Sequence, residues 1–331
     1  MPHAAKCSIC GGEAVYYSPL TRQHLCAGHF TSYFRGRVGL VVDRYRLLDR
    51  VSSVVVLAAS GGKDSAAAAD VLSWLAGRRG LRLLLVHVDV GVPGFSDASR
   101  RAVEELGGFL GAPAAVLSLR DAVGMAVHEL ARRARRPVCS VCGLVKRYFI
   151  NAACLAAGES IVFTGHNMDD MATYAFKNFI MQDLAAIRKL VPCTEPVDGL
   201  AAGRARPLYE TPEREAELYV RLRGVPYTAE ECSFKPHSTL DEAIRRAVRL
   251  IDGEKPGTIL SMMRRLASSA RQYPEPSYPV KPCRFCGALS SRGECSFCRL
   301  TRRVLGEPMG ARVRDYVKDV VAEALGGGGA S

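Results

Sequence analysis

The feature that most constrains the fold is a glycine-containing loop directly after an apolar run. Residues 53–59 read Ser-Val-Val-Val-Leu-Ala-Ala, which is typical of a strand covered on both faces. The loop is Ser60, Gly61, Gly62, Lys63, Asp64 and Ser65, and an Ala-rich segment follows it. Glycines let the backbone approach an anion closely, and a helix N-terminus offers unpaired N–H groups. The sequence therefore predicts a phosphate-binding loop, whose spacing differs from the G-x-x-x-x-G-K-[ST] loop of kinases and GTPases.

The segments after this loop alternate between apolar and amphipathic character. Further strands are expected at 81–88, 114–117 and 161–164, and helices at 64–77, 96–110 and 141–157. Such alternation predicts an α/β protein with a doubly wound parallel sheet. Ligands of these sheets collect beyond the carboxyl ends of the strands, where both Ser60 and Gly165 are expected.

Composition and charge bear on location and partners. The 331 residues are 48% hydrophobic, yet no uninterrupted apolar run approaches the roughly 18 to 20 residues of a membrane span. We expect a soluble cytoplasmic protein with no membrane association. The net charge of +12 favours a polyanionic partner such as a nucleic acid, with basic clusters at residues 132–136, 264–265 and 299–303.

Two sets of closely spaced ligands lie near the ends of the chain. The first is Cys7, Cys10, Cys26 and His29, with His24 as a spare candidate, and the second is Cys283, Cys286, Cys295 and Cys298. Each set offers two tight pairs of nitrogen or sulfur ligands, which is the pattern of a closed tetrahedral Zn²⁺ site. We predict two structural zinc modules, because a four-ligand site leaves no position for a substrate.

Three inner cysteines are ambiguous from their spacing alone. Cys139 and Cys142 form a C-x2-C pair at the start of a predicted helix, and Cys232 stands alone far along the chain. A helix N-terminus beside basic residues stabilises thiolates. The pattern is compatible with an iron–sulfur cluster, a catalytic disulfide pair or a zinc site with a further ligand.

A second polar loop is expected at the end of the strand at 161–164. It contains Gly165, Asn167, Asp169 and Asp170. Gly165 permits close backbone approach, and one of the aspartates could hold Mg²⁺ or orient the base that is activated. Asn167 is also a suitable helix N-cap, an interpretation that is compatible with the first.

The phosphate loop resembles the S-G-G-x-D-S loop of the PP-loop ATP pyrophosphatase superfamily. The order of five motifs also resembles the tRNA 2-thiouridine synthetases of the two-zinc-finger branch: residues 60–65, 139–147, 164–170, 204–208 and 231–232. The resemblance implies an adenine nucleotide α-hydrolase-like sheet and ATP as cosubstrate. It also implies a 4Fe–4S cluster on Cys139, Cys142 and Cys232, and Lys146 acting beside the nucleotide. Met171 stands where the family often has Glu, which weakens any assignment finer than the two aspartates.

The resemblance implies adenylation of a uridine C2 oxygen, followed by sulfur transfer from the cluster, with a T-loop uridine slightly favoured over a wobble uridine. The partners would be tRNA and either a ubiquitin-like thiocarboxylated carrier or a simpler sulfide source; a homodimer is compatible. Expected domains are 1–35 for the first zinc module, 50–272 for catalysis and 278–325 for the second module, after a Pro-rich linker at 273–276. Two alternatives remain open: a cluster-free PP-loop enzyme that adenylates tRNA, and a non-catalytic zinc protein that binds RNA.

Overall fold

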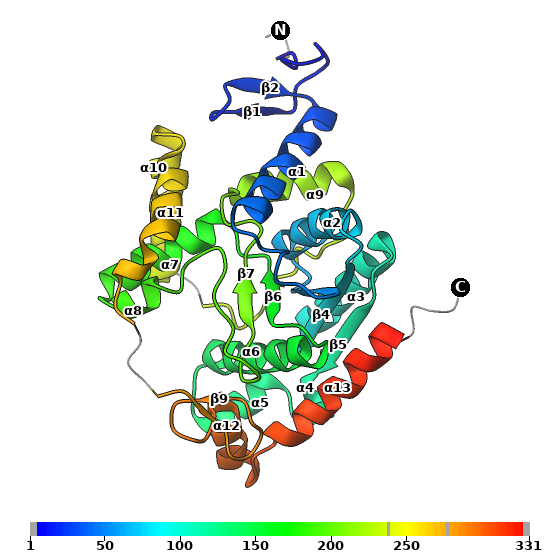
Figure 1. The fold of residues 1–331 in the computed structure, drawn as a ribbon, viewed down its shortest axis with the longest axis vertical. Helices are drawn as coiled ribbons and strands as arrows, with labels where there is room; N and C mark the ends of the chain where they lie inside the picture. The colour runs from blue at the N-terminus through cyan, green and yellow to red at the C-terminus, as the bar shows by residue number, and fades with distance from the viewer. Residues whose placement is uncertain (1–4, 237–238, 276–278, 327–331) are drawn as a thin grey trace.

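The computed structural model describes residues 5–236, 239–275 and 279–326, and its centre is a five-stranded parallel sheet (Figure 1). The sheet order is β5-β4-β3-β6-β7. The strands are β3 (Val54–Ala58), β4 (Arg82–Asp89), β5 (Ala114–Ser118), β6 (Ile161–Thr164) and β7 (Gly203–Ala205). The predicted doubly wound sheet is confirmed. Sequence analysis missed β7, because three residues that include Gly and Arg carry no strand signal.

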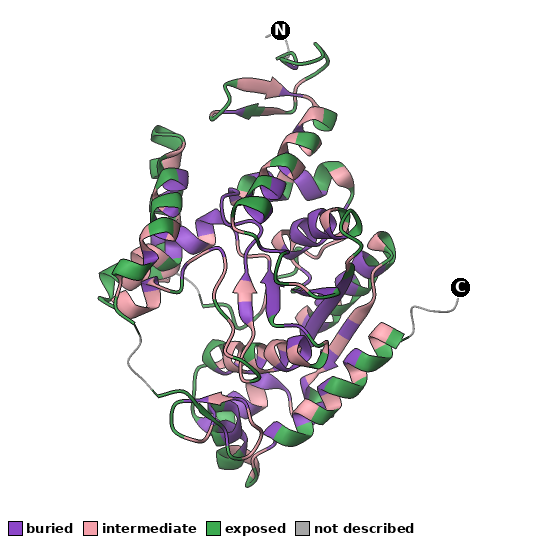
Figure 2. Ribbon diagram, in the orientation of Figure 1, coloured by how far each residue is buried: buried purple, intermediate pink, exposed green. Residues whose placement is uncertain are grey.

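Both faces of the sheet are covered, as the continuous apolar runs indicated. Val55 and Leu57 of β3 belong to one core cluster, whereas Val54 and Val56 belong to a second cluster on the other face. This alternation follows from the two-residue repeat of a strand. Figure 2 shows the central strands in the colour of buried residues.

Helices form a layer on each face of the sheet. The first core cluster includes residues of α1 (Ala27–Arg44), α2 (Lys63–Gly77), α3 (Phe95–Leu110), α7 (Met168–Ile180), α8 (Leu184–Ile187), α9 (Glu213–Arg223), α10 (Leu240–Glu254) and α11 (Thr258–Ser269). The second includes residues of α4 (Leu119–Val123), α5 (Val127–Ala134), α6 (Val138–Ala156), α12 (Ser296–Leu305) and α13 (Gly310–Gly326). The helices predicted at 64–77, 96–110 and 141–157 are confirmed, although α6 begins earlier and contains both Cys139 and Cys142.

The two cysteine-bearing modules lie at opposite ends of the long axis of the molecule (Figure 1). The N-terminal module contains the hairpin of β1 (Tyr16–Ser18) and β2 (Gln23–Leu25), and the C-terminal module contains β8 (Lys281–Pro282), β9 (Leu289–Ser290) and α12. Helix α1 runs across the expected boundary at residue 35. The expected linker reaches Pro276, and the third expected domain begins at Tyr278; both residues lie outside the described part of the chain.

Helix α1 attaches the N-terminal module to the sheet domain through buried ion pairs. Arg35 pairs with Asp70 at 2.9 Å, and Arg37 pairs with Glu215 at 2.7 Å. Arg44 pairs with Glu210 at 2.7 Å. Each of these carboxylate side chains is at most 4% exposed.

Two further contacts complete these buried pairs. The Tyr16 hydroxyl of the hairpin donates to Glu215 at 2.7 Å. Arg264, which belongs to one of the basic clusters in the sequence, donates to Glu210 and neutralises a buried carboxylate. Buried charges of this kind are tolerated only when they are paired and hydrogen-bonded.

One described helix, α6, is long and apolar enough to cross a membrane when judged by length and composition alone. In the structure it packs against β4 and β6 and against α5, α12 and α13. This is the position of a core helix in a globular α/β domain.

Candidate active site

The phosphate loop follows β3, and hydrogen bonds of its own serines fix its conformation. The Ser65 hydroxyl donates to the Gly62 carbonyl at 2.8 Å and accepts from the Ser60 N–H at 3.2 Å. The Ser60 and Ser65 hydroxyls lie 3.0 Å apart. Helix α2 then begins at Lys63, with Gly62 as N-cap. The first N–H groups of α2 therefore face the loop, as phosphate binding requires.

Two glycines bring the backbone segments of this site together. Gly61 has φ +86°, and a Cβ there would lie 2.9 Å from the Ser99 backbone. A Cβ on Gly165, which follows β6, would lie 2.7 Å from the backbone of Ser65. The close approach predicted for Gly165 is therefore made to the phosphate loop itself. Strands β3 and β6 are neighbours, and the sheet order reverses between them, so the site lies at the switch point of the sheet.

A pocket of about 400 Å³ opens between these two loops and α6. Its polar lining includes Ser60, Asp64, Lys146, Arg147, Asp170 and Arg204. A larger pocket of about 720 Å³ lies elsewhere, between α7 and α11, and its lining is mainly apolar. We take the smaller pocket as the nucleotide site, because charged groups converge there and two strand ends form it.

The structure assigns different positions to the two aspartates of the second loop. Asn167 caps α7 by accepting from the Asp170 N–H at 3.0 Å, so the capping interpretation is confirmed. Asp169 is buried and accepts from the Glu213 N–H at 2.8 Å, away from the pocket. Asp170 lines the pocket and pairs with Arg245 at 2.5 Å. Of the two described aspartates, Asp170 lines the pocket and Asp169 does not.

Asp64 is the second pocket carboxylate. Burial raises its pKa to about 6; the charge of Lys63 opposes this shift, and the charge of Asp170 adds to it. The Oδ1 atom of Asp64 is buried and has no hydrogen bond of normal geometry among the described residues, although the Asn167 side chain lies near this carboxylate and lowers its pKa. Because Mg²⁺ prefers carboxylate oxygens, this unpaired oxygen fits a cation that accompanies ATP.

One face of α6 carries both thiols and pocket residues. Cys139, Cys142 and Lys146 are spaced three and four residues apart, and Lys146 and the adjacent Arg147 line the pocket. Lys146 thus lines the candidate nucleotide pocket, and its action beside the nucleotide stays a prediction.

The segment that carries Cys232 connects the phosphate loop with α6. The Thr228 N–H donates to the Gly61 carbonyl at 2.8 Å, and the Cys139 thiol donates to the Phe234 carbonyl at 3.4 Å. Cys232 lies between these two contacts, and its charge acts on Cys142. The three cysteines are therefore brought to one side of the pocket.

Two properties of these thiols decide what they can hold. In each of the two outer sets, all ligand atoms lie within 4.8 Å of one another. Among the described residues, the three inner thiols do not form such a group. That arrangement disfavours one shared zinc ion, whereas in a cluster each thiolate binds its own iron. Burial raises the pKa of Cys142, while Lys146 and Arg147 only partly oppose it. The basic neighbours therefore act on this pKa in the expected direction, but burial outweighs them.

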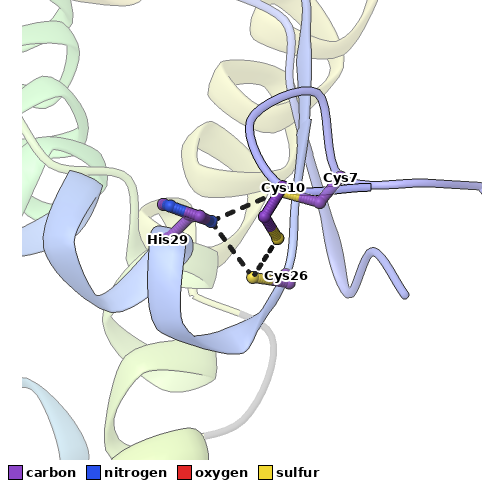
Figure 3. A group of neighbouring side chains, drawn as sticks. All are labelled: Cys7, Cys10, Cys26 and His29. Carbon is purple, nitrogen blue, oxygen red and sulfur yellow. Dashed lines mark hydrogen bonds between the residues drawn. The ribbon is translucent and has the colours of Figure 1, made fainter. Parts of the chain in front are cut away.

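The N-terminal ligands are arranged for one ion (Figure 3). The Sγ atoms of Cys10 and Cys26 are 3.8 Å apart, and His29 Nδ1 lies 3.4 Å from Cys7 Sγ and 3.3 Å from Cys26 Sγ. Tetrahedral zinc with Zn–S bonds of about 2.3 Å requires sulfur atoms about 3.8 Å apart. The geometry therefore fits zinc and selects His29, since the ring of His24 packs against Tyr17.

The C-terminal ligands are similarly arranged. Cys286 and Cys295 have Sγ atoms 3.7 Å apart, and all four ligand atoms lie within 4.8 Å of one another. A Cβ on Gly310 would overlap Cys298 Sγ, so the start of α13 packs directly on this group. The Phe297 ring stacks on Tyr148 of α6 at 4.1 Å, which joins the module to the helix that carries the pocket lysine.

Sequence analysis did not single out four charged residues of this region. Arg147 and Arg204 line the pocket, Arg245 pairs with Asp170 of its lining, and Glu213 pairs with Arg245. Arg147 and Arg204 belong to motifs that were recognised, so their position in those motifs was the available signal. Glu213 and Arg245 had none, because their partners lie far away in the sequence. Lys63, in contrast, was predicted at the phosphates but does not line the pocket; its ammonium group contacts Glu213.

The fold and this site together define a PP-loop protein. A family profile described as a PP-loop domain matches residues 41–249, more than half of the chain. A second profile, described as the N-terminal LIM domain of the 2-thiouridine synthetase TtuA, matches residues 6–31.

Within this class, the chain belongs to the tRNA 2-thiouridine synthetase family. It is 32% identical over 298 residues to the tRNA-5-methyluridine(54) 2-sulfurtransferase of Pyrococcus horikoshii, covering 89% of this chain and 93% of that one. It is 33% identical over 307 residues to cytoplasmic tRNA 2-thiolation protein 1 of Bos taurus, covering 90% and 87%. Among solved structures, it is similar to the U34-tRNA thiolase NcsA from Methanococcus maripaludis, described with its 4Fe–4S cluster. The TM-score is 0.74 at 21% identity, over 91% of this chain and 96% of that one.

Proposed function

We propose that this protein replaces the C2 oxygen of a tRNA uridine with sulfur, after activating that oxygen with ATP. The observation that carries the proposal is the shared face of α6, which places Cys139 and Cys142 one to two helical turns from Lys146 and Arg147 of the nucleotide pocket. Activation and sulfur delivery must occur at the same carbon atom, so both sets of groups need to reach one substrate. Relatives named for tRNA 2-thiolation and 2-sulfurtransfer support this proposal.

In the first step, the uridine C2 oxygen attacks the α-phosphorus of ATP and pyrophosphate leaves. The phosphate loop and the N-terminus of α2 bind the phosphates through backbone N–H groups. Lys146 and Arg204 line the pocket and balance the negative charge that moves onto the leaving group. Asp64 and Asp170 are the carboxylates that would hold Mg²⁺ there.

In the second step, a sulfur nucleophile attacks C2 and AMP leaves with the former C2 oxygen. The three thiols of Cys139, Cys142 and Cys232 would hold a 4Fe–4S cluster, and three protein ligands leave one iron available to bind sulfur. The chain itself positions these thiols by α6 and by the contacts of Thr228 and Phe234. The outer zinc sites act as structural supports.

The modified position is proposed to be a T-loop uridine. Three relatives are named for 5-methyluridine at position 54: those of Pyrococcus horikoshii, Thermus thermophilus and Thermotoga maritima. The solved structure similar in fold is named for position 34, and the Bos taurus relative is named only for tRNA 2-thiolation. We propose a cytoplasmic location, which agrees with the name of the Bos taurus relative. A thiocarboxylated carrier as sulfur donor and a homodimer stay predictions.

The test is anaerobic purification followed by incubation with ATP and unmodified tRNA. We expect iron and acid-labile sulfide in the protein, tRNA-dependent release of pyrophosphate, and 2-thiouridine in the T-loop by mass spectrometry. Pyrophosphate release by protein without iron would instead indicate a cluster-free adenylating enzyme. Absence of both pyrophosphate and thiouridine would contradict the proposal and favour a non-catalytic RNA-binding protein. Thiolation of the wobble uridine would reject the T-loop assignment alone.

A further inference from the structure

The phosphate-loop lysine has a partner that neither the motif nor the pocket reveals. Lys63 Nζ lies 2.6 Å from Glu213 Oε1 and 3.2 Å from Asp64 Oδ2. Glu213 is the first residue of α9 and lies 150 positions further along the chain. Neither Lys63 nor Glu213 lines the nucleotide pocket, but Lys63 Nζ contacts Asp64, which does, so the ammonium group lies at the edge of the pocket.

Glu213 is itself held in place from two directions. Its backbone N–H donates to the buried Asp169 carboxylate at 2.8 Å, and Pro212 precedes it as the N-cap of α9. Its second oxygen, Oε2, accepts from Arg245 at 2.9 Å and from Arg249 at 2.5 Å. One carboxylate thus contacts three cations from two separate helices, α2 and α10.

The charges around Glu213 keep it ionised. Burial raises the pKa of Glu213, but hydrogen bonds from Lys63 and Arg249 and the charges of Lys63 and Arg245 outweigh this effect and lower the pKa to about 2. The side chain is 18% exposed, so water only partly screens these contacts. A full negative charge is therefore present beside Lys63 at neutral pH.

An ammonium group has three N–H donors. Within the described chain, two of those of Lys63 have acceptors, on Glu213 and Asp64. The third is available for a phosphate oxygen. A free lysine side chain would lose rotamer entropy on being fixed, and here that loss precedes substrate binding. A charge fixed in advance stabilises a transition state better than one that must reorganise.

We propose that Glu213 is a positioning residue for adenylation, which fixes the Lys63 ammonium group at the phosphate loop so that it meets the departing pyrophosphate. The inference rests on the function proposed above and extends it to a residue outside the recognised motifs. Glu213 acts through Lys63 and does not touch the substrate. Removing the Glu213 charge should therefore slow adenylation only in a protein that still has Lys63.

This dependence is tested by a double-mutant cycle of wild type, Glu213→Gln, Lys63→Ala and the double variant. Pyrophosphate release in the presence of tRNA is measured as a function of ATP concentration. We expect Glu213→Gln to lower kcat about tenfold, with a smaller change in KM for ATP, since the interaction is realised in the transition state. The double variant should be no slower than Lys63→Ala, because the two residues act as one unit.

The matched control is Glu217→Gln, which makes the same chemical change at an exposed position one turn further along α9. It should keep wild-type kcat. If Glu213→Gln does not fold, the cycle is run with Glu213→Asp, which keeps the charge and shortens the side chain by one methylene group. The double variant of Glu213→Asp and Lys63→Ala is again expected to be no slower than Lys63→Ala alone.

Multiplicative losses in the double variant, or a wild-type rate for Glu213→Gln, would overturn the positioning role. Those outcomes leave the proposed function intact, because wild-type protein still releases pyrophosphate. A wild-type protein that releases none would contradict the proposed function instead. If Glu213 had a purely structural role, its substitution would lower the melting temperature, and the rate losses of the two single variants would multiply in the double variant. The cycle distinguishes that outcome from coupling through Lys63.

Discussion

Replacing Gly165 with Ala tests whether the two loops of the pocket have a fixed separation. The new Cβ would lie 2.7 Å from both Cα and N of Ser65 and 2.9 Å from the carbonyl carbon of Asp64. All of these are backbone atoms, so no flexible side chain can move aside. Ordinary contact begins at 3.4 Å, and the loops must therefore separate by about 0.7 Å, the difference between 3.4 and 2.7.

The magnitude follows from that displacement. Overpacking of a tight site costs about 1–3 kcal/mol, which lowers the melting temperature of a chain this long by about 2–12 °C. A misplacement of about 1 Å can reduce a rate about 100-fold, so pyrophosphate release should fall about 10- to 100-fold. The loss should appear mainly in kcat, because the loop that holds the phosphates is displaced from the other reacting groups.

The assay measures tRNA-dependent pyrophosphate release and thermal unfolding on the same preparations. Gly77→Ala is the matched control, since Gly77 ends the same helix α2 and its Cβ would have no atom within 4 Å. It should be as active as wild type and equally or slightly more stable. Full activity with unchanged melting in Gly165→Ala would refute the reasoning, because it would show that the loops can part without effect.

Three further outcomes are expected. Cys142→Ala should abolish 2-thiouridine formation while tRNA-dependent pyrophosphate release continues, whereas Cys193→Ala, at the sheet edge beside β7, should retain both. Cys283→Ser should remove one zinc ion per chain by metal analysis and lower the melting temperature, because an incomplete ligand set no longer stabilises the C-terminal module. The pKa of Asp64, raised to about 6, means that the free protein holds a proton there in mild acid. Calorimetric Mg-ATP affinity should therefore fall about tenfold per unit below pH 6, and Asp64→Asn should bind weakly with no such dependence.

The sheet could be predicted because its strands have a strong local signal. The apolar runs of β3, β4 and β6 are buried on both faces, and that requirement is visible in composition alone. Strand β7 could not be predicted, since three residues at a sheet edge acquire their conformation by pairing with β6. The ion pairs of α1 were also beyond prediction, because Glu210 and Glu215 lie more than 160 positions from Arg44 and Arg37.

The candidate site also contains residues that the sequence predicted and residues that it could not. Residues in motifs, such as Ser65 and Asp170, were predicted because residue type and spacing carry the chemistry. The sequence could not separate Asp169 from Asp170, since their distinction depends on which carboxylate meets the Glu213 backbone. The sequence also indicated Lys63 as a phosphate-binding residue but did not reveal Glu213 as its partner. Local motifs identify the groups, whereas the three-dimensional contacts determine which way each group points.

The arginines of α1 have a consequence for how the N-terminal module can be exchanged. Arg35, Arg37 and Arg44 each reach a different buried carboxylate, so a slip of α1 by a single residue would break three buried ion pairs together. Helix α1 therefore has one favourable register against the sheet domain, which fixes the position of the N-terminal module. A chimera that imports this segment from a relative should fold only when Asp70, Glu210 and Glu215 have counterparts matched to the incoming helix.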